Sequence, residues 1–373
     1  MNLKLIGTTM VLLLAASACG GSDDGGGASS AAADCKPGET DGDLSFYNWA
    51  DYMDEDLISQ FEDETGISVD YSIYASNEEM LAQVDANAAV YDLVVPSDYM
   101  VDTMRQEDLL IELNFDAIPN AKNIGSEWDA PPFDSENKFH VPYQWGTTGI
   151  GISYEALEAL GDPEPTWGFI FDPELSSQIP GGIAMLDDAP EAVSAALKYL
   201  GYSINDVMTN GNEDAIREAG ELLKETRDRL VKYDSITYAD DLVNGEVGAS
   251  HGWSGGFALS LFEADAYETH VYVIPKEGAV RWVDTMAIPV TAEHPCSAHA
   301  MINFLTDAQN GATLTNFVYY ASPNEAATEF ILPEILEDPG IYPTAEVKAN
   351  LEFIPQAGDL GLLIQDVFTE SKG

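Results

Sequence analysis

The sequence predicts an α/β protein that is divided into two lobes. Three observations lead to this prediction. Short apolar or alternating stretches, typical of strands, alternate with amphipathic stretches typical of helices. The 373 residues are enough for about two domains. Strand-like and helix-like stretches occur both before and after an extended stretch rich in Gly and Thr, HVPYQWGTTGIGISY (140–154). This stretch predicts a strand that crosses from one lobe to the other.

The first lobe begins with a strand, a helix and a second strand. DLSFYNW (43–49) alternates and carries aromatic residues, which indicates a strand. DEDLISQFEDETG (54–66) predicts a helix, with Asp54 as the cap at its start and Gly66 at its end. ISVDYSIY (67–74) then alternates with the period of two that a half-buried strand shows.

Two further helices and a strand complete this part. SNEEMLAQVDAN (76–87) opens with Ser76 and Glu79 at capping-box spacing, so a helix follows. YDLVVPS (91–97) is a continuous apolar strand, and DYMVDTMRQEDLLIEL (98–113) predicts another helix. Short strand and helix units in this order favour a mainly parallel sheet.

The rest of the chain has the same mixture of elements. The predicted helices are PEAVSAALKYLGY (190–202), NEDAIREAGELLKETRDRL (212–230) and SAHAMINFLTDAQNGATLTNF (297–317). The predicted strands are GEVGASHGW (245–253), ETHVYVIPKEG (268–278) and the extended RWVDTMAIP (281–289). We expect lobe 1 to comprise residues 43–145 plus 283–328, and lobe 2 to comprise residues 146–282 plus 329–373.

The charge excludes some partners. The chain has 15 basic and 65 acidic residues, a formal net charge of -50. It therefore repels nucleic acids and anionic lipid surfaces, and it attracts cations such as metal ions, polyamines or basic peptides. A surface adapted to high salt explains the same acidity without any ligand, so individual carboxylates must identify the ligand.

The N-terminus predicts export. A basic start, a short apolar core and the small residues before Cys19 form a signal peptide over residues 1–19, too short to span a bilayer. Residues 20–42 form a tether rich in Gly and Ser. The arrangement resembles a bacterial lipoprotein signal, which implies that Cys19 is lipidated and anchors an extracytoplasmic protein to the membrane. The alternative is ordinary cleavage and a free secreted protein.

Two cysteines remain, Cys35 and Cys296. In an oxidising compartment they form a pairable set, and a disulfide would hold the end of the tether to the body. The alternative is two unpaired thiols, one buried and one exposed.

Known catalytic and metal-binding motifs are absent from the sequence. It contains no zinc pattern, no Walker loop, no twelve-residue calcium loop and no G-x-S-x-G nucleophile motif. We therefore expect no metal and no cofactor. Asp188 and Glu191 are a carboxylate pair that would suit a secreted hydrolase, although closeness in sequence says little about spacing across a sugar bond.

Aromatic and acidic residues recur together at the ends of predicted strands. In an open α/β sheet, ligands bind beyond these ends. Aromatic faces attract cations, and each close contact contributes roughly 0.5–2 kcal/mol. Ordinary packing explains any one of these aromatics, but it explains less readily a recurring association with acids. The residues are Trp49, Asp51 and Tyr52, then Tyr99, Trp253, Trp282 with Asp284, and Tyr320.

From about residue 43 to the C-terminus, the chain resembles the polyamine-binding members of the extracytoplasmic solute-binding proteins of ABC transporters. The resemblance implies a two-lobed periplasmic-binding-protein fold of type II, with a cleft between lobes joined by crossing strands. It also implies a non-enzymatic, monomeric receptor that delivers spermidine or putrescine to a permease. The matching stretches are FYNWADYM, FEDETGISVDYSIYASNEEM, YDLVVPSDYMVDTMR, PYQWGTTGIGIS, LDDAPEAV, RWVDTMAIP, INFL and YYASPN.

The resemblance also implies a set of ligand-binding residues. The family's aromatic box corresponds to Trp49, Tyr52, Tyr99, Trp253, Trp282 and Tyr320. Its other ligand contacts correspond to Asp51, Ser97, Asp188, Glu191 and Asp284, and loosely to Gln356. The chain departs from the family at Ala50, Gly255 and Gly256, which lack polar side chains, so another cationic amine or a guanidino solute is an alternative ligand.

The stretch MLDDAPEAVS (185–194) has two compatible explanations. Asp188 suits the cap of a helix, and Glu191 suits its first turn, where carboxylates are favourable. Both carboxylates also suit an ammonium ligand. Asp187 is expected to face solvent.

Overall fold

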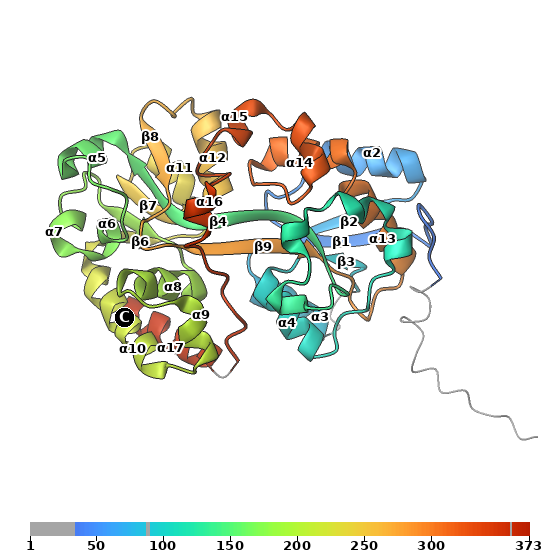
Figure 1. The fold of residues 1–373 in the computed structure, drawn as a ribbon, viewed down its shortest axis with the longest axis horizontal. Helices are drawn as coiled ribbons and strands as arrows, with labels where there is room; N and C mark the ends of the chain where they lie inside the picture. Colours follow the sequence, from blue (N-terminus) through green and yellow to red (C-terminus); the bar gives the residue numbers. More distant parts are fainter. Residues whose placement is uncertain (1–33, 87–89, 359) are drawn as a thin grey trace, which may run out of the picture.

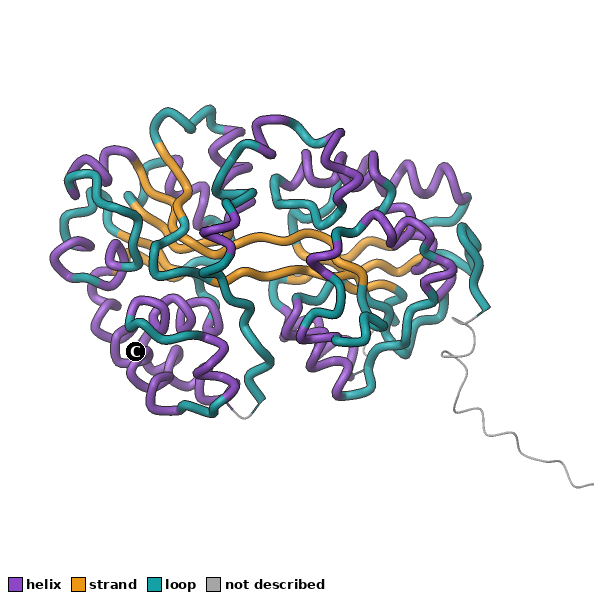
Figure 2. The backbone as a smooth tube through the Cα atoms, viewed as in Figure 1, coloured by secondary structure: helices purple, strands orange, loops and turns teal. Residues whose placement is uncertain are grey.

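The computed structural model describes residues 34–86, 90–358 and 360–373 of the chain, and these form two lobes (Figure 1). In both lobes the strands lie inside and helices cover them (Figure 2). The first lobe has a parallel sheet in the order β2–β1–β3. Its strands are β1 Leu44–Trp49, β2 Val69–Tyr74 and β3 Leu93–Val94.

The second sheet has the order β6–β5–β7–β4–β8, with β9 also paired to β4. β5 pairs in parallel with β6 and β7, whereas β4 is antiparallel to β7, β8 and β9. The strands are β4 Val141–Ser153, β5 Ile183–Met185, β6 Leu230–Tyr233, β7 Ala249–Trp253, β8 His270–Val273 and β9 Val280–Met286.

Strands β4 and β9 connect the two lobes (Figure 1). One part of β4, Thr148–Ser153, pairs with β7 and β8 of the second lobe. Another part, Val141–Thr148, pairs with β9. Backbone bridges from Asp284 to Ser97 and from Ala287 to Val94 then join this end of β9 to the first lobe. The predicted crossing stretch 140–154 thus corresponds to β4.

Helices of the first lobe surround its small sheet. They are α2 Glu55–Thr65, α3 Asn77–Asp85, α4 Asp98–Gln106, α13 Pro295–Leu305 and α14 Ala308–Val318. Short 3₁₀ turns connect them: η1 Phe115–Ala117, η2 Pro119–Asn123, η3 Ser126–Trp128, η4 Pro132–Asp134 and η6 Glu325–Phe330.

The second lobe carries most of the remaining helices. They are α5 Tyr154–Leu160, α6 Gly168–Phe171, α7 Pro173–Ser176, α8 Ala189–Tyr199, α9 Ile204–Thr209, α10 Glu213–Thr226, α11 Tyr238–Val243 and α12 Ser254–Glu263, with the turn η5 Arg227–Arg229. Late in the chain come α15 Pro333–Leu336, α16 Ala345–Lys348 and α17 Leu360–Lys372, the last of which packs on α8 and α10.

The predicted caps at the start of the chain are confirmed. Asp54 accepts a hydrogen bond from the backbone of Asp56, and Gly66 ends α2 with a left-handed φ of 77°. Ser76 accepts from the backbone of Glu79. The carboxylate of Glu79 bonds the backbone N–H of Ala75 rather than that of Ser76, so the reciprocal half of the capping box is shifted by one residue.

Several predicted helices differ in extent from those of the structure. The helix expected over 98–113 ends at Gln106, because Asp108 adopts a left-handed φ of 56° and the chain then runs extended. Backbone hydrogen bonds from Ile111 to Ile288 and from Val290 to Leu109 hold this extended part. The helix expected over 297–317 is divided into α13 and α14, and Asp307 caps the second.

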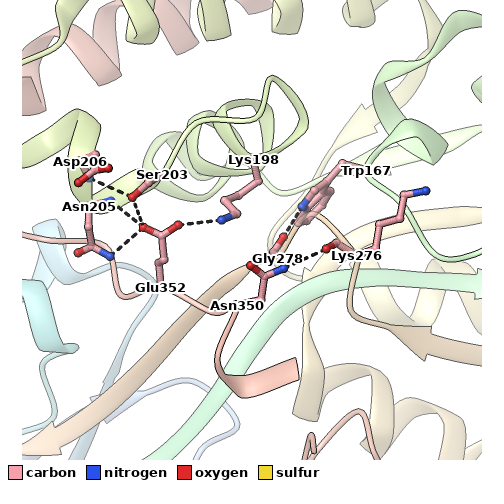
Figure 3. A network of polar contacts seen from close by, with 9 residues as sticks. All are labelled: Trp167, Lys198, Ser203, Asn205, Asp206, Lys276, Gly278, Asn350 and Glu352. Atoms are coloured by element: carbon pink, nitrogen blue, oxygen red, sulfur yellow. Dashed lines mark hydrogen bonds and ion pairs between the residues drawn. The ribbon is translucent and has the colours of Figure 1, made fainter. Parts of the chain in front are cut away.

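A third connection between the lobes runs from α16 to α17. The Glu352 carboxylate accepts hydrogen bonds from Lys198 Nζ at 2.7 Å, Ser203 Oγ at 2.6 Å and Asn205 Nδ2 at 2.9 Å, all in the second lobe (Figure 3). Burial opposes ionisation, but these donors lower the pKa of Glu352 to about 2. The next residue, Phe353, instead packs in the cluster of the first lobe. Consecutive residues are thus anchored in different lobes.

Cys35 and Cys296 form a disulfide, with their Cα atoms 5.3 Å apart. The bond joins the start of the described chain to the first turn of α13. Of the two possibilities that the sequence left open, the structure contains the paired one.

The predicted boundary between lobes at residue 328 stays a prediction. Ile331, Ile335 and Ile341 lie beyond it, yet they pack in the same hydrophobic cluster as Val94 and Met100 of the first lobe.

Among the described residues, no helix has both the length and the apolarity needed to cross a membrane.

Candidate ligand-binding site

Asp284 is a buried carboxylate at the point where β9 meets the first lobe. Its Oδ1 accepts a hydrogen bond of 2.6 Å from Ser97 Oγ, and its side chain takes part in no ion pair within the described chain. Burial raises the pKa of Asp284 to about 7, against the opposing effect of the Ser97 and Tyr52 hydroxyls. A carboxylate that loses water without gaining a cation is destabilised in its charged form. Asp284 is therefore suited to receive a cation.

Aromatic rings form a wall beside Asp284. The rings of Tyr52 and Tyr320 meet edge to face at a centroid distance of 5.3 Å, and those of Tyr320 and Trp282 at 5.2 Å. The indole N–H of Trp282 is buried and has no hydrogen-bond partner among the described residues. A Cβ atom at Gly255 would overlap the Tyr320 ring, so the glycine lets this ring lie against α12.

Asp188 and Glu191 lie at the start of α8, directly after β5. Asp188 caps the helix by accepting a 3.0 Å hydrogen bond from the backbone of Glu191. Burial raises the pKa of Asp188 to about 6, with contributions from Glu78 and Asp187, against the effect of this hydrogen bond. Asp187 itself is exposed, as expected, and pairs with Lys372.

The Glu191 side chain is buried with only half of its hydrogen-bonding capacity used. Oε1 accepts from Thr148 Oγ1 at 2.9 Å and from Trp253 Nε1 at 3.2 Å. Oε2 is buried and has no partner within the described chain. Burial, and then the neighbouring Asp188, raise the pKa of Glu191 to about 8. An unpartnered buried carboxylate oxygen is costly unless a ligand binds it.

Tyr99 interacts with carboxylates of both lobes. Its hydroxyl accepts from Asn77 Nδ2 at 3.0 Å and donates to Glu78 Oε1 at 3.2 Å. Burial raises the pKa of Tyr99, and the charges of Glu78 in the first lobe and Asp188 in the second raise it further. Carboxylates from both lobes are therefore close to this one side chain.

Three other predicted residues, described next, make no hydrogen bond to Asp284, Asp188 or Glu191 within the described chain. Trp49 donates its indole N–H to the Val95 carbonyl at 2.9 Å and packs against the Tyr74 ring. Asp51 is exposed, with a left-handed φ of 53°. Gln356 accepts a long, exposed hydrogen bond from Gln106 at 3.5 Å.

The sequence and the fold are those of a known family. Residues 56–344 match the family described as bacterial extracellular solute-binding protein. The chain belongs to this family. The solute-binding protein is therefore a binding component and not an enzyme, as predicted, and the hydrolase alternative is excluded.

Two curated relatives are similar over most of this solute-binding protein. The spermidine/putrescine-binding periplasmic protein of Escherichia coli K12 is 34% identical over 333 residues, which cover 88% of this chain and 91% of the relative. The putrescine/cadaverine-binding protein of Pseudomonas aeruginosa is 32% identical over 312 residues, which cover 83% of this chain and 87% of the relative.

Solved structures confirm the predicted fold class. The spermidine/putrescine ABC transporter substrate-binding protein PotD of Streptococcus pneumoniae has a TM-score of 0.75 and 30% identity, covering 89% of this chain and 99% of that one. The TpPotD lipoprotein of Treponema pallidum has a TM-score of 0.77 and 28% identity, covering 88% and 99%.

Sequence reasoning missed three polar residues of this solute-binding protein. Asn77 bonds both Ser97 and Tyr99, and Glu78 accepts from Tyr99. Asp98 is buried and accepts from the backbone of Val283, and burial raises its pKa to about 8. In the sequence all three look like ordinary first-turn residues of helices, where polar and acidic side chains are common.

Proposed function

We propose that this protein captures a polyamine, spermidine or putrescine, between its lobes and delivers it to the permease of an ABC transporter. The observation that carries the proposal is the set of buried carboxylates without cationic partners, Asp284 and Glu191, beside aromatic rings. The curated relatives, whose names give polyamines as ligands, support the same class of ligand.

The proposed binding mode follows from these side chains. One ammonium group binds Asp284, and a second binds Asp188 and Glu191. At about 4 Å and an effective dielectric constant near 20, each charge pair gains about 4 kcal/mol before desolvation. The rings of Tyr52, Trp282 and the other aromatics line the methylene chain, whose burial contributes about 0.8 kcal/mol per CH₂. A long, thin, multiply charged solute fits this pattern.

Ligand entry is expected to close the lobes by hinge motion, since only the closed form satisfies carboxylates from both lobes at once. The permease then recognises the closed form. We also propose that the protein is monomeric and is held at the membrane by a lipid on Cys19, which lies outside the described residues.

Calorimetry on the purified mature chain tests this function. Spermidine or putrescine should bind with saturating heat, and Asp284→Asn should weaken binding by 2 kcal/mol or more, about thirtyfold, because a charged hydrogen-bonded partner is lost. Asp187→Asn is the matched control, since Asp187 is exposed and paired with Lys372, and it should bind like the wild type. Absence of saturation with every polyamine would refute the ligand assignment.

A further inference from the structure

We propose that Glu78 is a further specificity-determining carboxylate of this site, which binds the second ammonium group of the ligand. Asn77 orients Glu78 through the hydroxyl of Tyr99. The inference rests on the proposed function and extends it. The side chain of Asn77, at the start of α3, is buried and positions this part of the site.

Asn77 uses every polar atom of its side chain. Its Nδ2 donates to Ser97 Oγ at 3.0 Å and to Tyr99 Oη at 3.0 Å. Its Oδ1 accepts from the backbone N–H of Ser97 at 3.1 Å. Because both amide hydrogens are donated, the two hydroxyl oxygens act as acceptors toward Asn77.

This arrangement determines the direction of the next two hydrogen bonds. A hydroxyl that accepts from Asn77 keeps its own hydrogen for another acceptor. Ser97 donates this hydrogen to Asp284 at 2.6 Å, and Tyr99 donates to Glu78 at 3.2 Å. One amide therefore orients two carboxylates, Asp284 in the interior and Glu78 at the exposed end of the same chain of hydrogen bonds.

Glu78 is the outer end of this chain of hydrogen bonds, four contacts away from Asp284. It lies in the first turn of α3, and Asp188 caps α8 of the second lobe, yet the charge of Glu78 raises the pKa of Asp188. Neither carboxylate takes part in an ion pair within the described chain. An ammonium group bound between Glu78 and Asp188 would therefore pair with one carboxylate from each lobe.

The consequence is discrimination by charge number. A monoamine that binds Asp284 leaves Glu78 and Asp188 without a cation. A diamine or triamine places a second cation between them and favours closure. Glu78 would therefore contribute to the binding of polyamines and little to that of monoamines.

The test compares Glu78→Gln with Glu79→Gln, which removes an equal charge from the neighbouring exposed residue of α3. Calorimetry with spermidine, putrescine and n-butylamine gives the dissociation constants. Glu78→Gln should weaken spermidine and putrescine about tenfold and n-butylamine less than twofold. Glu79→Gln should change none of them by more than twofold.

The outcomes separate this inference from the proposed function. If the wild type binds polyamines and Glu78→Gln binds them as tightly as Glu79→Gln does, the role of Glu78 is refuted and the function stands. If the wild type binds no polyamine, the function itself is refuted.

The positioning role of Asn77 has its own readout. Asn77→Ala removes the donor that orients Ser97, so the Ser97 hydroxyl no longer lowers the pKa of Asp284 as effectively. The pH at which putrescine affinity is half-maximal should move upward by at least half a pH unit in a protein that still unfolds cooperatively. An unchanged pH midpoint would refute the positioning role.

Discussion

At the scale of single residues, the protein keeps carboxyl groups buried without cations. Burial raises the pKa of Asp284 to about 7 and, together with Asp188, that of Glu191 to about 8. These groups therefore hold protons near neutral pH in the ligand-free protein. An alkylammonium ligand, whose pKa resembles that of Lys at about 10.4, remains charged in the same range.

Polyamine affinity should consequently rise at least tenfold between about pH 6 and pH 8, because carboxyl groups with raised pKa values must lose protons to pair with ammonium groups. The groups facing Asp284 are Ser97, Tyr52 and Asp98, and those facing Glu191 are Asp188, Asp98, Thr148 and Trp253.

Calorimetry in two buffers of different ionisation enthalpy checks this expectation, since binding at about pH 7 should release protons to the buffer. An affinity that is constant over the range, with no proton release, would contradict it.

At the scale of elements, three helices carry carboxylates of the site at their N-termini. The first turns of α3 and α4 carry Glu78 and Asp98, and Asp188 caps α8. Helix N-termini carry partial positive charge and stabilise nearby carboxylates by about 0.3–1 kcal/mol each. The same helices that position the carboxylates therefore reduce the energy needed to keep them there before a ligand arrives.

Asp188 has two roles that substitution should separate. Asp188→Asn keeps a good helix cap and removes the charge, so stability should change by a few tenths of a kcal/mol while polyamine binding weakens at least tenfold. Asp188→Ala loses both roles and should also destabilise the fold by about 1 kcal/mol. Urea unfolding and calorimetry measure the two effects, and equal stability of the two variants would contradict the capping role.

At the scale of the whole molecule, the net charge of -50 affects the stability of the fold. Most carboxylates repel each other across the surface, and this repulsion destabilises the compact state at low salt. Added salt shortens the screening length from about 10 Å at 0.1 M to about 3 Å at 1 M.

The melting temperature should therefore rise by about 5 °C or more between roughly 0.1 M and 1 M salt. Sodium chloride and potassium chloride should have nearly equal effects, because screening depends on ionic strength and not on the identity of the cation. Thermal unfolding followed by circular dichroism provides the measurement. A melting temperature that is independent of salt would show that charge repulsion on the acidic surface does not destabilise the fold.

The sequence predicted what depends on neighbours in the chain. The caps at Asp54 and Ser76 and the crossing strand β4 each follow from a few adjacent residues. The extended course of residues 109–113 could not be predicted in this way, because their hydrogen-bond partners are residues 288, 290 and 138, far away in the sequence.

For the site, too, residues with a local signal in the sequence were predicted, and residues whose partners are distant in the sequence were missed. Asp284 and Glu191 stood out in the sequence, as an acid beside an aromatic residue and as one of a carboxylate pair, and the family resemblance then assigned them to the ligand. Asn77 was missed because its partners, Ser97 and Tyr99, become its neighbours only in the folded chain. The ion pair of Asp187 with Lys372 spans 185 positions and has no local signal either.

The disulfide between Cys35 and Cys296 determines where a pull on the N-terminal end enters the body. Force applied there passes through α13 into the first lobe, while the lobe that carries Asp188 and Glu191 bears none of it. If the protein is held at the membrane as proposed, tension on its N-terminal end would load the first lobe alone, and the second lobe could still move relative to it during closure.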